Sequence, residues 1–303
     1  MALSLEDALA RVPHWAGATD IRTSPLGGGI TNQNFRVDVN GESFVLRIGG
    51  AKTELLGIDR RNEYAANQAA ASIGLAPDVI FFIEPEGYLV TRFLTARPLP
   101  REEIGKPENI RRVAAALNRL HALPSIPGAF SPFRTVEEYE RTARQHGVAF
   151  PDHFDWLMAR LREIEAAFLH DPFTPCPCHN DLLNENFLDD GNIRILDWEY
   201  AGMGDPAFDL ANFAVHHGFG DEQDAFLLAC YYLTPNPRRG MGVRFARHKL
   251  MKIVSDCREA MWGMVQIGIS KLDFDFRGYA DKHFNRMAEM IRDPRLEKWL
   301  KEF

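Results

Sequence analysis

Three polar residues follow one another at short intervals in the stretch CHNDLLNENFLDDGNIRILDWE, residues 178–199. Asp181 lies five positions before Asn186, and Asp197 lies eleven positions after Asn186. An amide oxygen and a carboxylate suit a hard cation such as Mg²⁺, which proteins hold by one or two carboxylates together with substrate phosphates. Asp181 is not needed as a ligand, so we expect it to act as a general base.

The segment that joins Asn186 to Asp197 has the pattern of a β-hairpin, with Gly191 in its turn. If Leu188 pairs with Ile193, Asp197 returns to within about two residues of Asn186, because opposed Cβ atoms lie only ~4.5–5.5 Å apart. We therefore expect Asn186 and Asp197 to share one Mg²⁺ ion.

Composition limits the classes of protein that this chain can belong to. Its 303 residues are 46% hydrophobic, carry a net charge of −7 and include four cysteines. No cluster of basic residues indicates nucleic-acid binding, and no apolar run approaches the roughly 18 residues of a membrane span. We expect a cytoplasmic protein without membrane insertion, and a homodimer is a candidate assembly.

The sequence CPCH at 176–179 offers zinc ligands in Cys176, Cys178 and His179. No second cysteine pair lies nearby in the sequence, and His179 belongs to the motif described above. A pair of small buried thiols is the interpretation that the sequence favours. His121 lies in the last turn of a predicted helix, where the helix dipole favours it, and it is given no chemical role.

The first 94 residues predict a small sheet with one helix after an amphipathic helix over 1–20. Asn40-Gly41 joins two alternating strands, so Val37 should face Phe44 and Asn34 should face Arg47. A helix over 58–73 and two strands within 78–94 follow. The glycine-rich PLGGGITNQN before the hairpin can offer backbone N–H groups to an anion.

Beyond a connector near 92–100, the sequence becomes mainly helical. Helices are expected over about 107–122, 152–169, 207–217, 222–233, 243–268 and 277–292 from the spacing of apolar residues. We expect two units, an N-terminal lobe over 1–94 and a C-terminal lobe over 95–303.

The motifs resemble those of the aminoglycoside phosphotransferase and choline kinase superfamily. His179-Asn180-Asp181 followed by Asn186, and then Asp197-Trp198-Glu199, have that superfamily's spacing. DPAFDLANF at 205–213, GGGITNQNF with FVLRI, and MWGMVQIGISKLDFDFRGYA at 261–280 extend the resemblance over most of the chain, the last toward choline and ethanolamine kinases.

The resemblance implies an α+β, bilobal protein-kinase-like fold with ATP in the cleft between the lobes. Asp181 would accept the proton of the acceptor hydroxyl, Asn186 and Asp197 would hold Mg²⁺, and His179, placed with the catalytic residues, would orient the loop rather than take a proton. Asp209 is expected to be a structural acid that bonds this loop. The implied nucleotide-binding residues are Gly28, Gly29, Thr31, Asn32, Arg47 paired with Glu63, and Arg92 and Phe93 near adenine.

The resemblance also implies a small cationic alcohol as the acceptor, with choline ahead of ethanolamine and thiamine or an aminoglycoside behind. The implied acceptor-site residues are Glu199, Tyr200, His216, Glu259 and Trp262. Two of them depart from the family pattern, because Glu259 stands where a tryptophan is expected and His216 where an acid is expected. Glu259 would then supply the missing negative charge.

Two other classes of protein remain open. A non-catalytic nucleotide-binding relative would lack one of Asp181, Asn186 and Asp197, which are all present. A metal-dependent hydrolase built on His179, Asp181 and His216-His217 would leave the glycine-rich segment, Arg47 and Glu63 without a purpose, and it would act without nucleotide.

Overall fold

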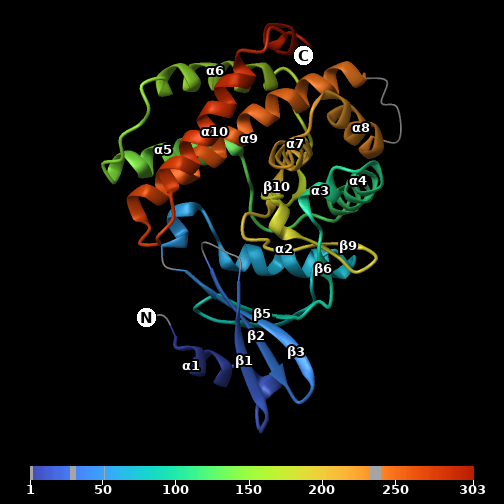
Figure 1. Ribbon diagram of the computed structural model, residues 1–303, viewed down its shortest axis with the longest axis vertical. Helices are drawn as coiled ribbons and strands as arrows, with labels where there is room; N and C mark the ends of the chain where they lie inside the picture. The colour runs from blue at the N-terminus through green and yellow to red at the C-terminus, as the bar shows by residue number, and fades with distance from the viewer. Residues whose placement is uncertain (1–2, 28–31, 51, 233–239) are drawn as a thin grey trace.

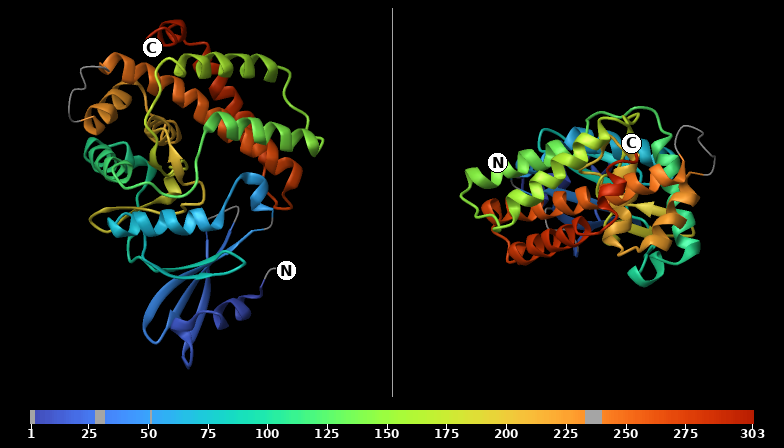
Figure 2. Two further views of the ribbon diagram at one scale, coloured as in Figure 1. Left: turned by 180° about the vertical axis from the view of Figure 1, so that it is seen from behind. Right: turned by 90° about the horizontal axis from the view of Figure 1, so that it is seen from above.

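The computed structural model describes residues 3–27, 32–50, 52–232 and 240–303. Within them a sheet-containing N-lobe and a helical C-lobe face each other, with helix α2 (Arg60–Ser72) between the sheet and the helices (Figure 1). The view from behind in Figure 2 shows α2 in the same place. This is the α+β bilobal arrangement that the sequence predicted.

The N-lobe is built on a five-stranded antiparallel sheet with the order β1-β2-β3-β5-β4. Its strands are β1 (Ile21–Leu26), β2 (Asn32–Val39), β3 (Glu42–Gly49), β4 (Val79–Ile83) and β5 (Tyr88–Arg92). The predicted hairpin register is confirmed, because Val37 faces Phe44 and Asn34 faces Arg47. Asn40 and Gly41 both have positive φ, as the tight turn requires.

The N-terminal helix is shorter than predicted. Helix α1 covers Leu5–Ala10, and a 3-10 turn over Pro13–Trp15 follows it. The sequence interpretation of one helix over 1–20 was wrong because proline lacks an N–H group and clashes with the preceding turn. Trp15 instead packs on Phe44, with the ring centroids 5.6 Å apart, and so covers one face of the sheet.

The C-lobe contains the remaining described helices and two small sheets, one of β7 and β10 and one with the order β6-β8-β9. Its helices are α3 (Arg101–Ile104), α4 (Pro107–His121), α5 (Pro132–Gln145), α6 (Phe154–Phe168), α7 (Pro206–His216), α8 (Asp221–Tyr231), α9 (Met241–Ile269), α10 (Phe276–Ile291) and α11 (Leu296–Trp299). Its strands are β6 (Arg97–Pro98), β7 (Cys176–Cys178), β8 (Phe187–Asp189), β9 (Ile193–Ile195) and β10 (Gly202–Gly204). The boundary at residues 94 and 95 falls between β5 and β6 and stays a prediction.

Helix α5 was absent from the sequence interpretation. Its charged residues outnumber its apolar ones, so the apolar stripe of Phe133, Val136, Tyr139 and Ala143 is easily overlooked. The signal that could have found it is its first turn, where Ser131 accepts the N–H of Arg134 and a proline follows at the first helical position.

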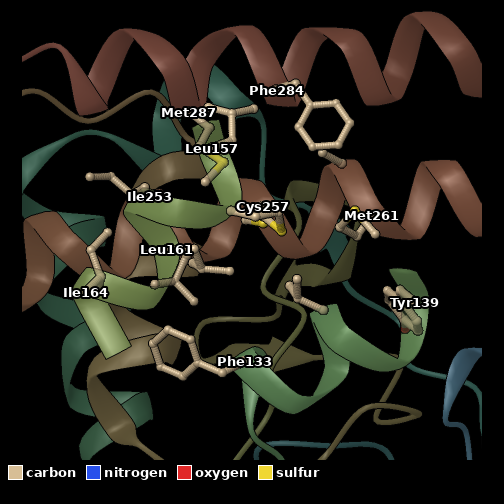
Figure 3. Close-up of a cluster of buried hydrophobic side chains, with 14 of the residues drawn as sticks. Phe133, Tyr139, Leu157, Leu161, Ile164, Ile253, Cys257, Met261, Phe284 and Met287 are labelled. Carbon is tan, nitrogen blue, oxygen red and sulfur yellow. The ribbon is translucent and has the colours of Figure 1, made fainter. Parts of the chain in front are cut away.

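The central element of the C-lobe is α9, whose residues 246–248 and 250–266 are buried. Helices α5, α6 and α10 pack around it and form one apolar cluster, which includes Leu157, Cys257 and Phe284 (Figure 3). Because α9 is fixed on several sides, the side chains that it carries toward the N-lobe have defined positions.

None of the helices in the described segments combines the length and apolar character needed to cross a bilayer.

Replacing Leu157 with Ala tests this packing. Leu157 is fully buried on α6, and a Leu→Ala change in a core costs about 2–5 kcal/mol through lost burial and a residual cavity. We expect the free energy of unfolding in urea to fall by that amount. Leu169→Ala is the matched control, because Leu169 is 77% exposed and should change the stability by no more than roughly 0.5 kcal/mol. Equal effects of the two changes would contradict the assignment of the core.

Candidate active site

The loop that carries Asp181 is held by helix α7. The buried Asp209 carboxylate accepts the backbone N–H groups of His179, at 2.8 Å, and of Asn180, at 2.7 Å. Asn180 has a positive φ of 66°, which non-glycine residues rarely adopt, so these two bonds secure an unusual backbone conformation. The prediction that Asp209 is a structural acid bonding this loop is confirmed.

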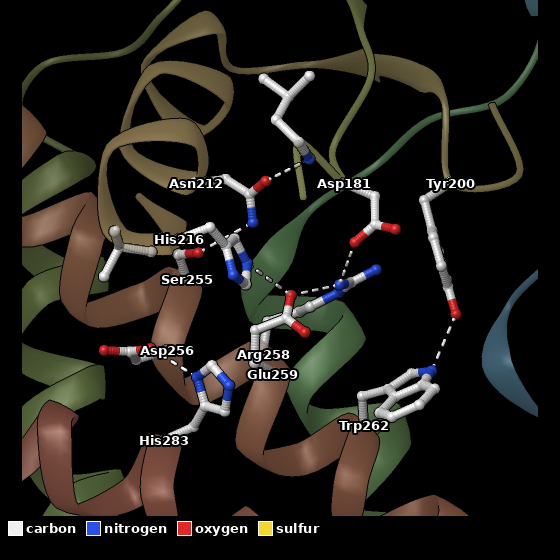
Figure 4. Close-up of polar contacts among 12 residues, drawn as sticks. Asp181, Tyr200, Asn212, His216, Ser255, Asp256, Arg258, Glu259, Trp262 and His283 are labelled. Atoms are coloured by element: carbon white, nitrogen blue, oxygen red, sulfur yellow. Dashed lines mark hydrogen bonds and ion pairs between the residues drawn. The ribbon is translucent and has the colours of Figure 1, made fainter. Parts of the chain in front are cut away.

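A second contact from α7 holds Leu182, the residue that follows Asp181 in the loop. The side-chain oxygen of Asn212 accepts the N–H of Leu182 at 2.6 Å, and its amide donates to Ser255 of α9 at 3.1 Å (Figure 4). Asp181 therefore lies between two backbone groups that α7 holds in place.

His179 contacts this loop from within. It is fully buried; its Nδ1 accepts the N–H of Asp181 at 3.2 Å, and its Nε2 donates to the carbonyl oxygen of Leu196 at 2.9 Å. Burial lowers the pKa of His179, which favours the neutral ring that these two bonds require. Both ring nitrogens are thus engaged by backbone groups, and the role of His179 in orienting the loop stays a prediction.

The Asp181 carboxylate reaches a cavity of about 900 Å³ that is lined by residues of both lobes. Its Oδ1 accepts a hydrogen bond from Arg258 of α9 at 3.0 Å. Burial raises the pKa of Asp181 to about 6, while the adjacent Arg258 favours the charged form and limits the rise. A carboxylate with this pKa is ionised near neutral pH and can accept a proton.

Asn186 and Asp197 come together as the hairpin prediction required, although the register differs by one residue. Leu188 faces Arg194 rather than Ile193, so the turn has three residues. The side chains of Asp189 and Asp190 stabilise this turn, because they accept the backbone N–H groups of Gly191 and Asn192, respectively. The carbonyl of Asn186 then accepts the N–H of Leu196, so Asp197 follows directly.

The surroundings of Asp197 fit a divalent cation. Among the described residues, no hydrogen-bond donor reaches its carboxylate, and it has a positive φ of 63°. Burial, together with the neighbouring carboxylate of Glu199, raises its pKa to about 8. A cation between Asp197 and the Asn186 amide oxygen would remove this electrostatic cost, and the oxygen donors suit Mg²⁺.

The N-lobe side of the cavity carries the predicted ion pair between Arg47 of β3 and Glu63 of α2. Both side chains are almost fully buried and line the cavity. Burial lowers the pKa of Arg47 to about 9, and the charge of Arg60 acts in the same direction. Arg47 also donates to the carbonyl of Gly87, so it is a fixed positive charge on the wall.

Glu199 lies nearer the N-lobe than expected. Its carboxylate accepts hydrogen bonds from Asn32 of β2 at 2.9 Å and from Arg60 of α2 at 3.0 Å. Arg60 also bonds Glu63 at 2.8 Å and Asn32 at 2.9 Å. Glu199 therefore bridges the two lobes and also lines the cavity, and its contact with the acceptor stays a prediction.

The other nucleotide-site predictions fall in two groups. Gly28, Gly29 and Thr31 lie outside the described residues. Arg92 and Phe93 line the cavity where the chain leaves β5. Arg92 pairs with Glu42 at 3.2 Å, and the ring of Phe93 lies against the Arg36 guanidinium at 4.6 Å.

The C-lobe wall of the cavity contains two aromatic side chains that support each other. Trp262 of α9 donates its indole N–H to the Tyr200 hydroxyl at 3.1 Å (Figure 4). The guanidinium of Arg258 lies 4.2 Å from the centre of the Tyr200 ring. One face of Tyr200 is thus occupied, whereas Trp262 still borders the cavity.

Glu259 is the acid of this wall, and it is surrounded by polar groups. It forms an ion pair with Arg258 and lies 3.5 Å from Nε2 of His216 (Figure 4). It also accepts a hydrogen bond from the Tyr279 hydroxyl at 2.7 Å. Although burial opposes it, the adjacent Arg258 holds the pKa of Glu259 well below its usual range. Glu259 and His216 both line the cavity, as placed from the sequence.

Two arginines at the site were missed from the sequence. Arg258 bridges Asp181 and Glu259, and Arg60 connects Glu199 to Glu63. Arg258 reaches Asp181 and Arg60 reaches Glu199 across long stretches of the chain, so periodicity gives no signal for these two contacts. The one available clue was the excess of carboxylates in 170–224, which requires cations from elsewhere.

Comparisons with known proteins agree with this geometry. The chain matches the model described as the phosphotransferase enzyme family over residues 22–241. Protein LicA of Haemophilus influenzae is 30% identical over 271 residues, which cover 88% of this chain and 79% of that protein. Ethanolamine kinase 2 of Homo sapiens is 27% identical, with 90% and 77% covered.

A solved structure extends the similarity to almost the whole fold. The crystal structure of a choline/ethanolamine kinase family protein from Mesorhizobium loti is 30% identical and superposes with a TM-score of 0.83. The match covers 98% of this chain and 96% of that one.

Binding of Mg²⁺ with ADP should depend on pH through Asp197. Its pKa is about 8 in the folded protein and about 3.9 in an unfolded chain, so the folded protein holds an extra proton between these values. The stability of the unliganded protein therefore falls as pH rises from 4 to 8. A cation must displace that proton, so affinity should rise by up to about tenfold per pH unit up to pH 8.

Calorimetric titration of Mg²⁺ in the presence of ADP, in two buffers with different ionisation enthalpies, measures the proton released. Asp197→Asn should weaken binding and abolish the proton release that Asp197 contributes. Asp190→Asn is the control, because Asp190 lies in the hairpin turn and outside the cavity lining. Unchanged proton release in Asp197→Asn would contradict this assignment.

Proposed function

Since this chain belongs to the phosphotransferase enzyme family and is a small-molecule kinase, we propose that it transfers a phosphoryl group from ATP to the hydroxyl of a small cationic amino alcohol, choline or ethanolamine. The names of its relatives support this acceptor class, since an ethanolamine kinase is similar over 90% of this chain and a choline/ethanolamine kinase family protein shares its fold.

The observation that carries the proposal is the charge of the acceptor wall. Asp181, Arg258 and Glu259 are buried, and the Arg258 guanidinium forms ion pairs with both carboxylates. Two carboxylates and one guanidinium leave one negative charge at the place where the acceptor hydroxyl must approach Asp181. A cationic acceptor balances this charge, whereas a neutral or anionic one leaves it in a medium of low dielectric constant.

The aromatic side chains add to this preference. Trp262 presents its ring to the cavity beside Tyr200, and attraction between a desolvated cation and an aromatic face contributes about 2 kcal/mol. The Glu259 carboxylate can in addition accept hydrogen bonds from a primary ammonium, which a trimethylammonium cannot donate. The wall can therefore bind the trimethylammonium of choline through its aromatic rings and the primary ammonium of ethanolamine through the Glu259 carboxylate as well.

Catalysis by the chain's own residues then consists mainly of positioning. Asp181 accepts the proton of the hydroxyl, and Arg258 keeps its carboxylate in place. Arg47, held by Glu63, supplies positive charge from the N-lobe to the phosphates of ATP. Asn186 and Asp197 would hold Mg²⁺, which would neutralise phosphate charge. Phosphoryl transfer needs little more than such placement and charge compensation.

Asp181→Asn tests the base. We expect Mg²⁺-ATP-dependent ADP release to occur with choline or ethanolamine, faster than with thiamine or an aminoglycoside, and the substitution to lower kcat by roughly 10²–10⁴-fold, since the amide cannot take the proton. Asp152→Asn, an exposed position outside the cavity, should keep full activity. Acceptor breakdown without nucleotide would instead favour the hydrolase alternative.

Glu259→Gln tests the acceptor charge. Removing one carboxylate leaves Arg258 and Asp181 balanced, so the attraction for a cation is lost. We expect KM for the amino alcohol to rise by about 10–100-fold, the equivalent of the 1.5–3 kcal/mol of a charged hydrogen bond, while KM for ATP stays the same. Glu289→Gln on the exposed side of α10 is the control. If KM for the amino alcohol did not change, Glu259 would have no role in recognition.

A further inference from the structure

Three side chains that can bind a soft metal meet behind the catalytic loop. Cys176 and Cys178 lie on β7, immediately before that loop, and His121 lies at the end of α4. One ligand atom from each lies within 4.8 Å of the others. No sequence pattern connects His121 with the cysteines, which lie more than 50 positions away.

The distance between the two sulfur atoms fits chelation of one ion. The Sγ atoms of Cys176 and Cys178 are 3.9 Å apart, and no disulfide joins them. Two Zn–S bonds of about 2.3 Å at a tetrahedral angle place their sulfur atoms about 3.8 Å apart. Alternate residues of a strand point to the same side, so the backbone of β7 already holds both thiols in this arrangement.

His121 has the outer partner that metal-binding histidines usually have. Its Nε2 lies 3.1 Å from the Asp209 carboxylate, and its Nδ1 lies 2.7 Å from the Tyr231 hydroxyl. Coordination through Nδ1 would replace the contact with Tyr231 and leave Nε2–H to donate to Asp209. A carboxylate in that place fixes the tautomer and raises the basicity of the ligand.

We propose that Cys176, Cys178 and His121 form a binding site for a thiophilic ion, Zn²⁺, distinct from the magnesium site in the cavity. On binding, two S–H bonds break, two Zn–S bonds form, and both protons leave to solvent. The ion with two thiolates and a neutral imidazole carries no net charge, which suits this largely buried position. Cys176 is only partly buried, so it gives the ion a route from solvent.

A bound Zn²⁺ ion would link two elements that are distant in the sequence. The ion would join α4 to β7, and the same His121 would hold Asp209, which bonds the backbone of His179 and Asn180. Zn²⁺ would thus secure the loop that carries Asp181 without touching the acceptor or the nucleotide. The site has neither a hard oxygen set nor phosphates, so Mg²⁺ would not compete for it.

The test is a calorimetric titration of the reduced protein with Zn²⁺, in the presence of excess Mg²⁺ to occupy the oxygen-ligand site in the cavity. Co²⁺ in place of Zn²⁺ gives the visible and sulfur-to-metal absorption of a tetrahedral thiolate site. We expect one Zn²⁺ per chain. Cys176→Ser should weaken binding by at least the roughly 10–100-fold that loss of an outer partner costs, and Cys230→Ser should not change it.

Cys178 is fully buried, so Cys178→Ser carries the risk of misfolding. Alkylation of the native protein, mapped by mass spectrometry, removes this difficulty, because Zn²⁺ should protect Cys176 and leave the reactivity of Cys230 unchanged. The proposal is overturned if no Zn²⁺ binds to the reduced protein, if binding survives in Cys176→Ser, or if Cys230 rather than Cys176 is protected. Protection of Cys176 with the cobalt spectrum supports it.

Discussion

The position of Asp181 depends on one buried carboxylate, that of Asp209. Asp209 has no exposed surface, and it accepts two backbone N–H groups from the loop that precedes Asp181. A carboxylate in such a place is stabilised only when donors surround it, and each such charged bond is stronger than a neutral one. The helix that carries Asp209 also carries Asn212, so α7 fixes the loop at both ends.

The second constraint is the balance of charge across the cavity. The carboxylates of Glu63, Glu199 and Glu259 each form an ion pair with a buried or half-buried arginine. These arginines come from elements that pack against the loop from different directions, β3, α2 and α9. Asp197 has no such partner among the described residues and keeps a pKa near 8, which is the electrostatic condition for a cation site. The arrangement thus leaves charge unbalanced only where a ligand is expected.

Sequence reasoning succeeded where the signal is local. The Asn40-Gly41 turn gave the correct register for β2 and β3, and the spacing of Asp181, Asn186 and Asp197 placed these three residues at one cavity. Sequence reasoning failed where the register of a hairpin depends on contacts with residues outside that hairpin. The hairpin at β8 and β9 shifted by one residue because Asp189 joins the strand, where Arg97 and Arg112 bind it from outside the hairpin.

The sequence by itself determined the fold class, the register of the β2–β3 hairpin and the approach of Asp181, Asn186 and Asp197 to one cavity, because these follow from periodicity, turn chemistry and short spacing. Only the tertiary structure decided that Arg258 bonds Asp181 and Glu259, that Glu199 turns to Arg60, and that His121 meets two cysteines. Apart from the adjacent pair Arg258 and Glu259, these contacts join residues separated by about 55 to 140 positions. Their formation depends on how α9, α2 and α4 pack, and local sequence patterns do not encode packing between distant helices.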